Sequence, residues 1–334
     1  MGFPVIAAAI SKYIFISATK TEVQSIHINM PDIDAEDSIP LDEGEVEYMG
    51  PRDYLRSGYN VMLRQGFETA TGWDVEVCGD IPINAGTSSS SALVTCWLLF
   101  LSNVGNVPVD PAQLATLGFL TEVKEFNEAG GMMDHFASSL GNLLFLETAP
   151  EFVPHPLPAT LGGFVLAYSG PKRCTVDDLR SVKTSSLQSF DVMKLIFPEF
   201  DPHTTSLEEI EPYIGSLSET SQKFLVGQIK DRDLTLQARE LLADVRPDEQ
   251  KLGEFLNAHH AILRDNLGIS TQTIEDMLAI AQNAGGLGGK INGSGFGGCM
   301  FSYCPEAQES VLNALTEAGF DGWSIDVSPG ASEL

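Results

Sequence analysis

A glycine-rich segment near the C-terminal end is the feature that most restricts how this chain folds. Residues 285–298 contain eight glycines among fourteen residues. Each glycine costs an ordinary helix or strand about 0.5–1 kcal/mol relative to alanine. Lys290, Ile291 and Phe296 interrupt the run, and a strand-like stretch follows, so a flexible linker is the weaker interpretation. The segment predicts a loop whose backbone approaches a ligand closely or adopts positive φ.

Composition narrows the classes of function that remain. The chain has 334 residues, 43% of them hydrophobic, which is enough for a large core or for two domains. Its 46 acidic and 19 basic residues give a net charge of −27. Such a surface repels nucleic-acid phosphates and anionic membranes, so we expect neither as a partner. A small anion can still be held by backbone N–H groups.

Membrane spans, leaders and disulfide frameworks are not indicated. No segment reaches the ~18–20 apolar residues that a span needs. The apolar start, Gly2 to Ile10, lacks a basic region before it and is interpreted as a buried strand, with a signal peptide as the weaker alternative. Five cysteines without a CxxC pair predict reduced thiols in a cytoplasmic protein.

Strands and helices mix without a regular βαβ rhythm, which predicts an α+β fold. An acidic stretch over residues 32–47 is interpreted as a solvated loop or a sheet edge. A Pro-rich joint over 150–158 is the expected domain boundary, which gives domains 1–155 and 156–334. A long helical region is expected to extend to about Leu242.

A loop of small residues directly before an apolar helix is a candidate phosphate site. Free N–H groups and the positive end of the helix dipole suit a polyphosphate there, and serine hydroxyls can bind Mg²⁺. An ordinary serine-rich helix cap is the alternative, and the sequence is not a Walker A loop. The candidate binding residues are Asn84, Ala85, Gly86, Thr87, Ser88, Ser89, Ser90 and Ser91.

A third candidate is Asp134, which follows two glycines and two methionines and could project into a cleft. By itself a helix-capping Asp is the better interpretation. The neighbouring His135 is interpreted as structural.

Together and in this order, the three motifs resemble those of the GHMP kinase superfamily, and most closely of galactokinases. Residues 82–92 are similar to the family's phosphate-binding motif, with Asn84 and Thr87 as departures. Residues 131–138 (GMMDHFAS) and 294–299 (SGFGGC) are similar to galactokinase segments. Further matches at residues 2–12 and 260–265 extend the resemblance over nearly the whole chain.

The resemblance implies two domains, a ribosomal-protein-S5-domain-2-like N-terminal one and a ferredoxin-like C-terminal one. It implies ATP and Mg²⁺ as cofactors, with Ser90 and Glu122 as metal ligands and Glu125 as the fallback. Asp134 would be the catalytic base for phosphoryl transfer to the anomeric hydroxyl of a monosaccharide, with galactose expected first. The implied substrate-binding residues are Asp134, Gly131, Gly293, Ser294, Gly295 and Gly297.

Two departures keep other functions open. The family's first motif, which supplies an Arg and sugar-binding residues, would precede Gly2 and is absent, which suggests a start assigned too far downstream. The place of a sugar-contacting Tyr, about Leu179 and Arg180, holds no Tyr. The alternatives are a kinase for a heptose phosphate, arabinose or mevalonate, and a catalytically impaired sugar sensor. We expect a monomer or weak homodimer whose partners are the sugar and ATP.

Overall fold

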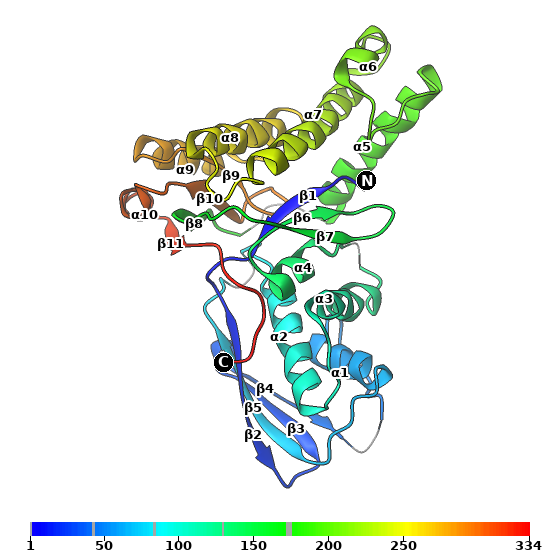
Figure 1. Cartoon of the computed structure of the whole chain (residues 1–334), viewed down its shortest axis with the longest axis vertical. Coiled ribbons are helices and arrows are strands. Elements are labelled where there is room, and N and C mark those ends of the chain that lie inside the picture. The colour runs from blue at the N-terminus through cyan, green and yellow to red at the C-terminus, as the bar shows by residue number, and fades with distance from the viewer. Residues whose placement is uncertain (1, 42–43, 83–84, 129, 172–175) are drawn as a thin grey trace. The chain divides into compact units, whose positions relative to one another are not determined.

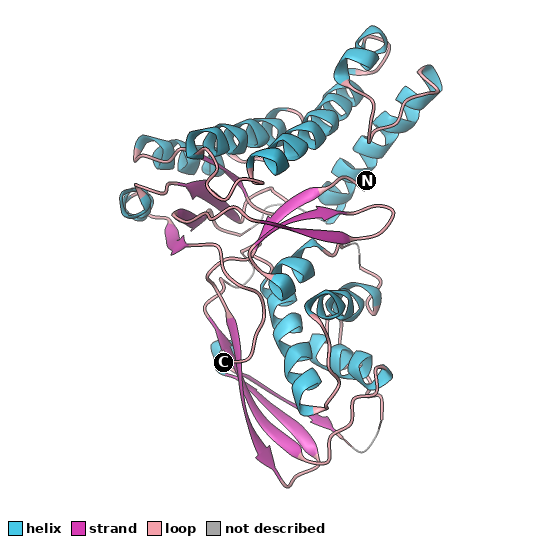
Figure 2. Ribbon diagram, in the orientation of Figure 1, coloured by secondary structure: helices cyan, strands magenta, loops and turns pink. Residues whose placement is uncertain are grey.

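The computed structural model describes residues 2–41, 44–82, 85–128, 130–171 and 176–334, and the side chains of residues 176–180 are not described. The chain forms two compact units that are interleaved along the sequence. The larger unit contains residues 1–6, 84–87 and 145–326, and the smaller one contains residues 7–83, 88–144 and 327–334. Both units mix helices with strands (Figure 2).

The smaller unit is a four-stranded sheet covered by helices (Figure 1). The strands lie in the order β2-β5-β3-β4, and only β3 and β5 run parallel. That parallel pair requires a crossover, which helix α1 provides. The elements are β2 (Ile14–Thr21), β3 (Ser25–Met30), η1 (Pro31–Ile33), β4 (Ala35–Pro40), α1 (Tyr54–Arg64), β5 (Gly72–Gly79), α2 (Ser89–Val104), α3 (Pro111–Phe119), η2 (Leu120–Lys124) and α4 (Met133–Leu140).

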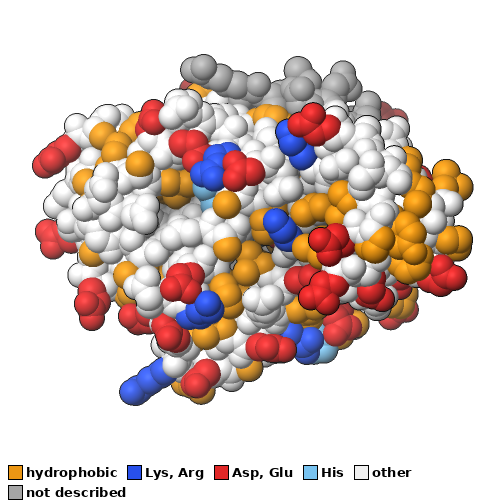
Figure 3. Space-filling view, turned by 90° about the horizontal axis from the view of Figure 1, so that it is seen from above, with side chains coloured by type: hydrophobic (Ala, Val, Ile, Leu, Met, Phe, Trp, Pro, Cys, Tyr) orange, Lys and Arg blue, Asp and Glu red, His pale blue; other side chains and the backbone are white. Residues whose placement is uncertain are grey.

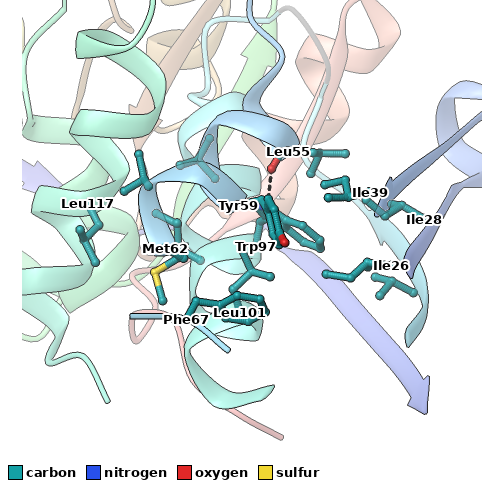
Figure 4. Close-up of a cluster of buried hydrophobic side chains, with 14 of the residues drawn as sticks. Ile26, Ile28, Ile39, Leu55, Tyr59, Met62, Phe67, Trp97, Leu101 and Leu117 are labelled. Atoms are coloured by element: carbon teal, nitrogen blue, oxygen red, sulfur yellow. Dashed lines mark hydrogen bonds between the residues drawn. The ribbon is translucent and has the colours of Figure 1, made fainter. Parts of the chain in front are cut away.

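The core of the smaller unit lies between this sheet and α1 and α2 (Figure 4). Ile26 and Ile28 alternate with more exposed neighbours on β3, as a strand with one buried face requires. Trp97 on α2 is fully buried and donates its indole N–H to the Leu55 carbonyl at 2.9 Å. Gly58 on α1 makes room for this ring, because a Cβ there would stand 2.7 Å from it.

The larger unit contains an antiparallel sheet in the order β11-β8-β10-β9, against which α8, α9 and α10 pack. A second apolar cluster forms where α5, α6 and α7 meet. The elements are β7 (Val153–Leu157), β8 (Phe164–Tyr168), α5 (Val176–Ile196), α6 (Leu207–Ile214), α7 (Glu219–Leu241), α8 (Glu249–Asp265), α9 (Gln272–Asn283), β9 (Gly288–Ile291), β10 (Cys299–Tyr303), α10 (Gln308–Glu317) and β11 (Asp321–Ile325).

A third sheet has the order β1-β6-β7, and the chain passes between the units within β1 (Val5–Ala8) and β6 (Leu143–Glu147). Segments of the two units therefore alternate along the sequence, and neither unit is one continuous stretch of chain. The division at residue 155 stays a prediction about family domains, and the contact units do not correspond to a single cut there.

The α+β class predicted from the sequence is confirmed, and the structure adds detail to three predicted segments. The acidic stretch contains β4, an edge strand whose Ile39 is buried, so the edge interpretation is the right one. The Pro-rich stretch over residues 150–158 is more than a connection, because it contains strand β7. Strand β7 lies at the edge of its sheet, where prolines are tolerated. The long helical region is three helices, since the segments around Pro198 and Gly215 separate α5, α6 and α7.

Some of the acidic side chains are paired with basic ones. On the face shown in Figure 3, acidic side chains are scattered, and several basic ones stand beside them. Arg64 is bound by Glu45 and Glu125, and Arg56 is bound by Asp37. In the part of the chain that the structure describes, no helix is both long and apolar enough to cross a membrane.

Replacing Trp97 by Ala should lower the free energy of unfolding by about 3–5 kcal/mol, since it empties the centre of the core. Trp97→Phe should cost less, because most of the apolar volume remains and only the bond to Leu55 is lost. Urea denaturation followed by circular dichroism measures both. Met49→Ala is the control, because Met49 is 81% exposed. Equal losses for Trp97→Ala and the control would contradict this description of the core.

Candidate functional site

Glu122 lies on a widened helical turn between α3 and α4. The turn η2 is π-helical, and the amide of Glu125 bonds the carbonyl of Leu120, five residues earlier, at 3.0 Å. The next such bond runs from Glu128 to Val123 at 2.9 Å. Single π-helical turns are rare and are frequently found at functional sites, where they shift side chains away from the regular helical register.

Three donors converge on the Glu122 carboxylate. Ser90 donates to Oε1 at 2.6 Å and Ser91 to Oε2 at 2.7 Å. His135 Nε2 lies 2.9 Å from Oε2. An ionised carboxylate only accepts hydrogen bonds, so the imidazole donates its Nε2–H. Helices α2 and α4 are thereby both bonded to one side chain of η2.

Glu122 is only 12% exposed, yet it is held in its charged form. Burial alone would raise its pKa, but the hydrogen bonds from His135, Ser90 and Ser91 outweigh burial and hold the pKa below its ordinary value. The smaller unit thus presents a fixed negative charge directly beside the first turn of α2.

The first turn of α2 is not capped by the side chain of its N-cap residue. Ser88 is the N-cap residue, has a left-handed φ of 58° and makes no side-chain cap bond. The hydroxyls of Ser90 and Ser91 are directed to Glu122 instead. The amides at this helix start point in the direction that suits an anionic ligand.

The glycine-rich loop in the larger unit adopts the backbone that its sequence predicts. Gly293, Gly295, Gly297 and Gly298 all have positive φ, and Phe296 between them has φ 61°. A Cβ at Gly295 would stand 2.7 Å from the Cβ of Ile269. The prediction of positive φ is therefore confirmed for this loop, and its approach to a ligand stays a prediction.

Asn292 connects this loop to the small-residue loop before α2. Its side-chain amide donates to the carbonyl of Gly86 at 3.0 Å, and both residues belong to the larger unit. The strand β9 that precedes it is anchored at Ile291, whose amide donates to His260 Nδ1 at 3.3 Å. The other nitrogen of His260 bonds Glu275 at 2.8 Å. A buried network therefore fixes the position of the residue that holds Gly86.

Two other side chains, Glu125 and Lys290, are bonded to groups outside the Glu122 cluster. Glu125, the fallback metal ligand, is bound by Arg64 at 2.6 Å and by the hydroxyl of Tyr48. Lys290 is half-buried, and its Nζ donates to the carbonyl of Ile291 at 2.9 Å. Burial lowers the pKa of Lys290 to about 8. Glu122 is the better metal ligand of the two acids.

The predicted site residues are divided between the two units. Asn84 lies outside the described residues. The larger unit contains Ala85, Gly86, Thr87, Gly293, Ser294, Gly295 and Gly297. The smaller unit contains Ser88, Ser89, Ser90, Ser91, Glu122, Gly131 and Asp134.

Asp134 is half-buried in the first turn of α4, directly before His135. Gly131 is exposed, and a Cβ there would meet no atom within 4 Å. Gly295 and Gly297 are buried, whereas Gly293 and Ser294 are exposed.

Sequence reasoning missed the contacts of His135 and Asn292. Neither carries a signal by itself, because a lone His or Asn within a motif has no spacing that identifies its partner. The available signal is their position, since His135 lies in the segment 131–138 and Asn292 lies in the glycine-rich segment 285–298.

The oxygens of Ser90 and Glu122 fit Mg²⁺. They are hard donors 2.6 Å apart, close enough to contact one ion. Within the described ranges, no group of three or more His, Cys, Asp or Glu side chains could hold a metal. An ion bound here would keep several waters or take oxygens from a phosphate, as Mg²⁺ commonly does.

Comparison with known families identifies two family domains in the chain. Residues 53–142 match the model of the GHMP kinase N-terminal domain, and residues 238–321 match that of the GHMP kinase C-terminal domain. The chain belongs to the GHMP kinase family. Its α+β architecture is the one expected for this family.

The relatives of this chain include mevalonate kinases and galactokinases. A mevalonate kinase of Thermococcus sibiricus is 26% identical over 326 residues, which cover 95% of this chain and 88% of that protein. A galactokinase of Pyrococcus furiosus is 25% identical over 305 residues, covering 88% and 81%. Among solved structures, Lactococcus lactis galactokinase complexed with galactose aligns with TM-score 0.82 at 22% identity, covering 100% and 90%. Methanococcus jannaschii mevalonate kinase aligns with TM-score 0.75 at 17% identity, covering 98% and 92%.

The pH dependence of stability should report the charge on Glu122. Because its pKa is lower in the folded state, its contribution is fully present above the unfolded value near ~4.3 and is lost as the pH falls through the folded value. Urea unfolding of wild type and Glu122→Gln between pH 7 and pH 3 should show a stability difference that shrinks toward acid. Glu68→Gln, which removes an exposed acid, is the control. A difference independent of pH would contradict the assignment.

Proposed function

We propose that this member of the GHMP kinase family transfers the γ-phosphoryl group of ATP to the anomeric hydroxyl of a monosaccharide, with galactose as the first candidate. The observation that carries the phosphotransferase part is the cluster of Ser90, Ser91 and His135 around the Glu122 carboxylate, with Asp134 next to it in the chain. Acidic and hydroxyl groups in this arrangement combine a cation site with a proton acceptor.

Each residue has a distinct task in the proposed reaction. Asp134 accepts the proton of the attacking hydroxyl, and the amides at the start of α2 bind phosphate oxygens. Ser90 and Glu122 would hold Mg²⁺, which would neutralise phosphate charge there. Ser91 and His135 keep the Glu122 carboxylate in place. Catalysis would then rest on positioning and charge neutralisation, as is usual for phosphoryl transfer.

Two sequence segments favour galactose. The structural alignments with the galactokinase complex and the mevalonate kinase, at 22% and 17% identity, support only the shared fold. The segments GMMDHFAS and SGFGGC, at residues 131–138 and 294–299, have galactokinase character. Mevalonate is the second candidate, because mevalonate kinases match the sequence with 26% identity over nearly the whole chain.

The substrate is tested by ADP release from Mg-ATP in a coupled assay. D-galactose, mevalonate, L-arabinose and a heptose phosphate are supplied one at a time, and each product is identified by mass spectrometry. We expect galactose-dependent release and a sugar 1-phosphate. Release with mevalonate alone would replace the sugar assignment and keep the kinase. Nucleotide binding without release with any acceptor would favour the sugar-sensor alternative.

Asp134→Asn should lower turnover by roughly 10²–10⁴-fold, because the amide cannot accept the proton. The affinity for ATP should stay within about twofold, since the change adds no bulk and leaves the first turn of α2 intact. Steady-state kinetics and calorimetric nucleotide titration measure the two quantities. Asp74→Asn, on the exposed side of β5, is the matched control. Wild-type turnover in Asp134→Asn would refute the base assignment.

A further inference from the structure

We propose that His135 is a positioning residue that fixes the Glu122 carboxylate, and with it the metal ligand, relative to the helix that carries Asp134. The inference rests on the proposed function, because it assigns a task to a side chain beside the proposed metal ligand. It differs from the sequence-based interpretation of His135 as merely structural.

The surroundings of His135 show what its imidazole is bonded to. The residue is 2% exposed, and Nε2 lies 2.9 Å from Glu122 Oε2. Its other nitrogen, Nδ1, is buried and has no hydrogen-bond partner among the described residues. Leaving a buried polar atom unpaired is destabilising. An apolar side chain of similar shape would avoid that cost, so the bond from Nε2 to Glu122 is what the imidazole contributes here.

The ring is also held in one orientation by its packing. A Cβ at Gly118 would stand 2.8 Å from His135 Cδ2, so α3 approaches the ring as closely as a residue without a side chain permits. The ring of Phe119 meets it edge-on, with centroids 6.2 Å apart and planes at 78°. The imidazole therefore cannot turn its Nε2–H away from Glu122 without moving α3.

The bond between His135 and Glu122 connects the proposed metal ligand to the helix that carries the proposed base, Asp134. Asp134 and His135 are consecutive in the first turn of α4, so the bond to Glu122 ties that turn to η2. The same carboxylate accepts from Ser90 on α2 through its other oxygen. Hydrogen-bonded partners of metal ligands commonly change metal affinity or activity by 10–100-fold when they are removed.

Metal binding tests the proposal without relying on catalysis. Mn²⁺ bound in the presence of ADP is measured by electron paramagnetic resonance, and ADP alone is measured by calorimetry. The variants are His135→Leu, which removes the donor, and His135→Gln, whose amide N–H can reach the same carboxylate. His259→Leu is the matched control, since His259 is paired with Asp231 at 2.9 Å in the other unit.

We expect His135→Leu to weaken Mn²⁺ binding by 10-fold or more and to leave the affinity for ADP alone unchanged. His135→Gln should stay within about threefold of wild type, and His259→Leu should match wild type. In the kinase assay, His135→Leu should lower kcat more than it raises KM for the acceptor. Wild-type Mn²⁺ affinity in a folded His135→Leu protein would overturn the proposal. Wild type that binds no Mn²⁺ with ADP would instead reject the proposed function, and the inference with it.

A second variant covers the case in which His135→Leu does not fold. Gly118→Ala keeps the imidazole but pushes it, because the added methyl group would overlap His135 Cδ2. We expect it to weaken Mn²⁺ binding in the same direction. Gly50→Ala is its control, since a Cβ at this exposed glycine meets nothing within 4 Å. Unchanged Mn²⁺ binding in folded Gly118→Ala would count against positioning by the ring.

Discussion

The carboxylate of Glu122 is the interaction on which the candidate site depends. A buried acid is stable in its charged form only where hydrogen bonds replace the lost water. Here Ser90, Ser91 and His135 provide them from α2 and α4. Because the three donors come from two helices, the charge on Glu122 and the positions of α2 and α4 depend on each other. The negative charge serves as a structural anchor and as a candidate ligand for a cation.

The widened turn explains how Glu122 can be both anchored and placed for chemistry. A regular helix would continue the register of α3, whereas the π-helical turn over Leu120–Lys124 changes the direction in which its side chains project. Gly118 lies just before that turn and leaves space for the His135 ring. A local departure from ideal helix geometry is thus combined with a missing side chain to accommodate one hydrogen bond.

In the larger unit, the candidate site residues depend on backbone conformation instead of on a buried charge. The glycine loop over 293–298 needs left-handed residues in succession, which only glycine adopts without a steric cost. Asn292, at the start of that loop, holds the carbonyl of Gly86. Segments far apart in sequence are thereby connected by one amide, and the strand that carries it is in turn fixed through His260.

The sequence by itself determined the α+β class, the positive-φ glycine loop, the serine-rich start of α2 and the family. These follow from local properties: periodicity, the conformational freedom of glycine and motifs at fixed spacing. Only the tertiary structure decided that Glu122 and not Glu125 faces Ser90, since Arg64 and Tyr48 hold Glu125. It also decided that His135 has a partner at Glu122. Such choices depend on contacts between residues distant in sequence, and local pattern carries no information about which distant side chain will occupy a given carboxylate.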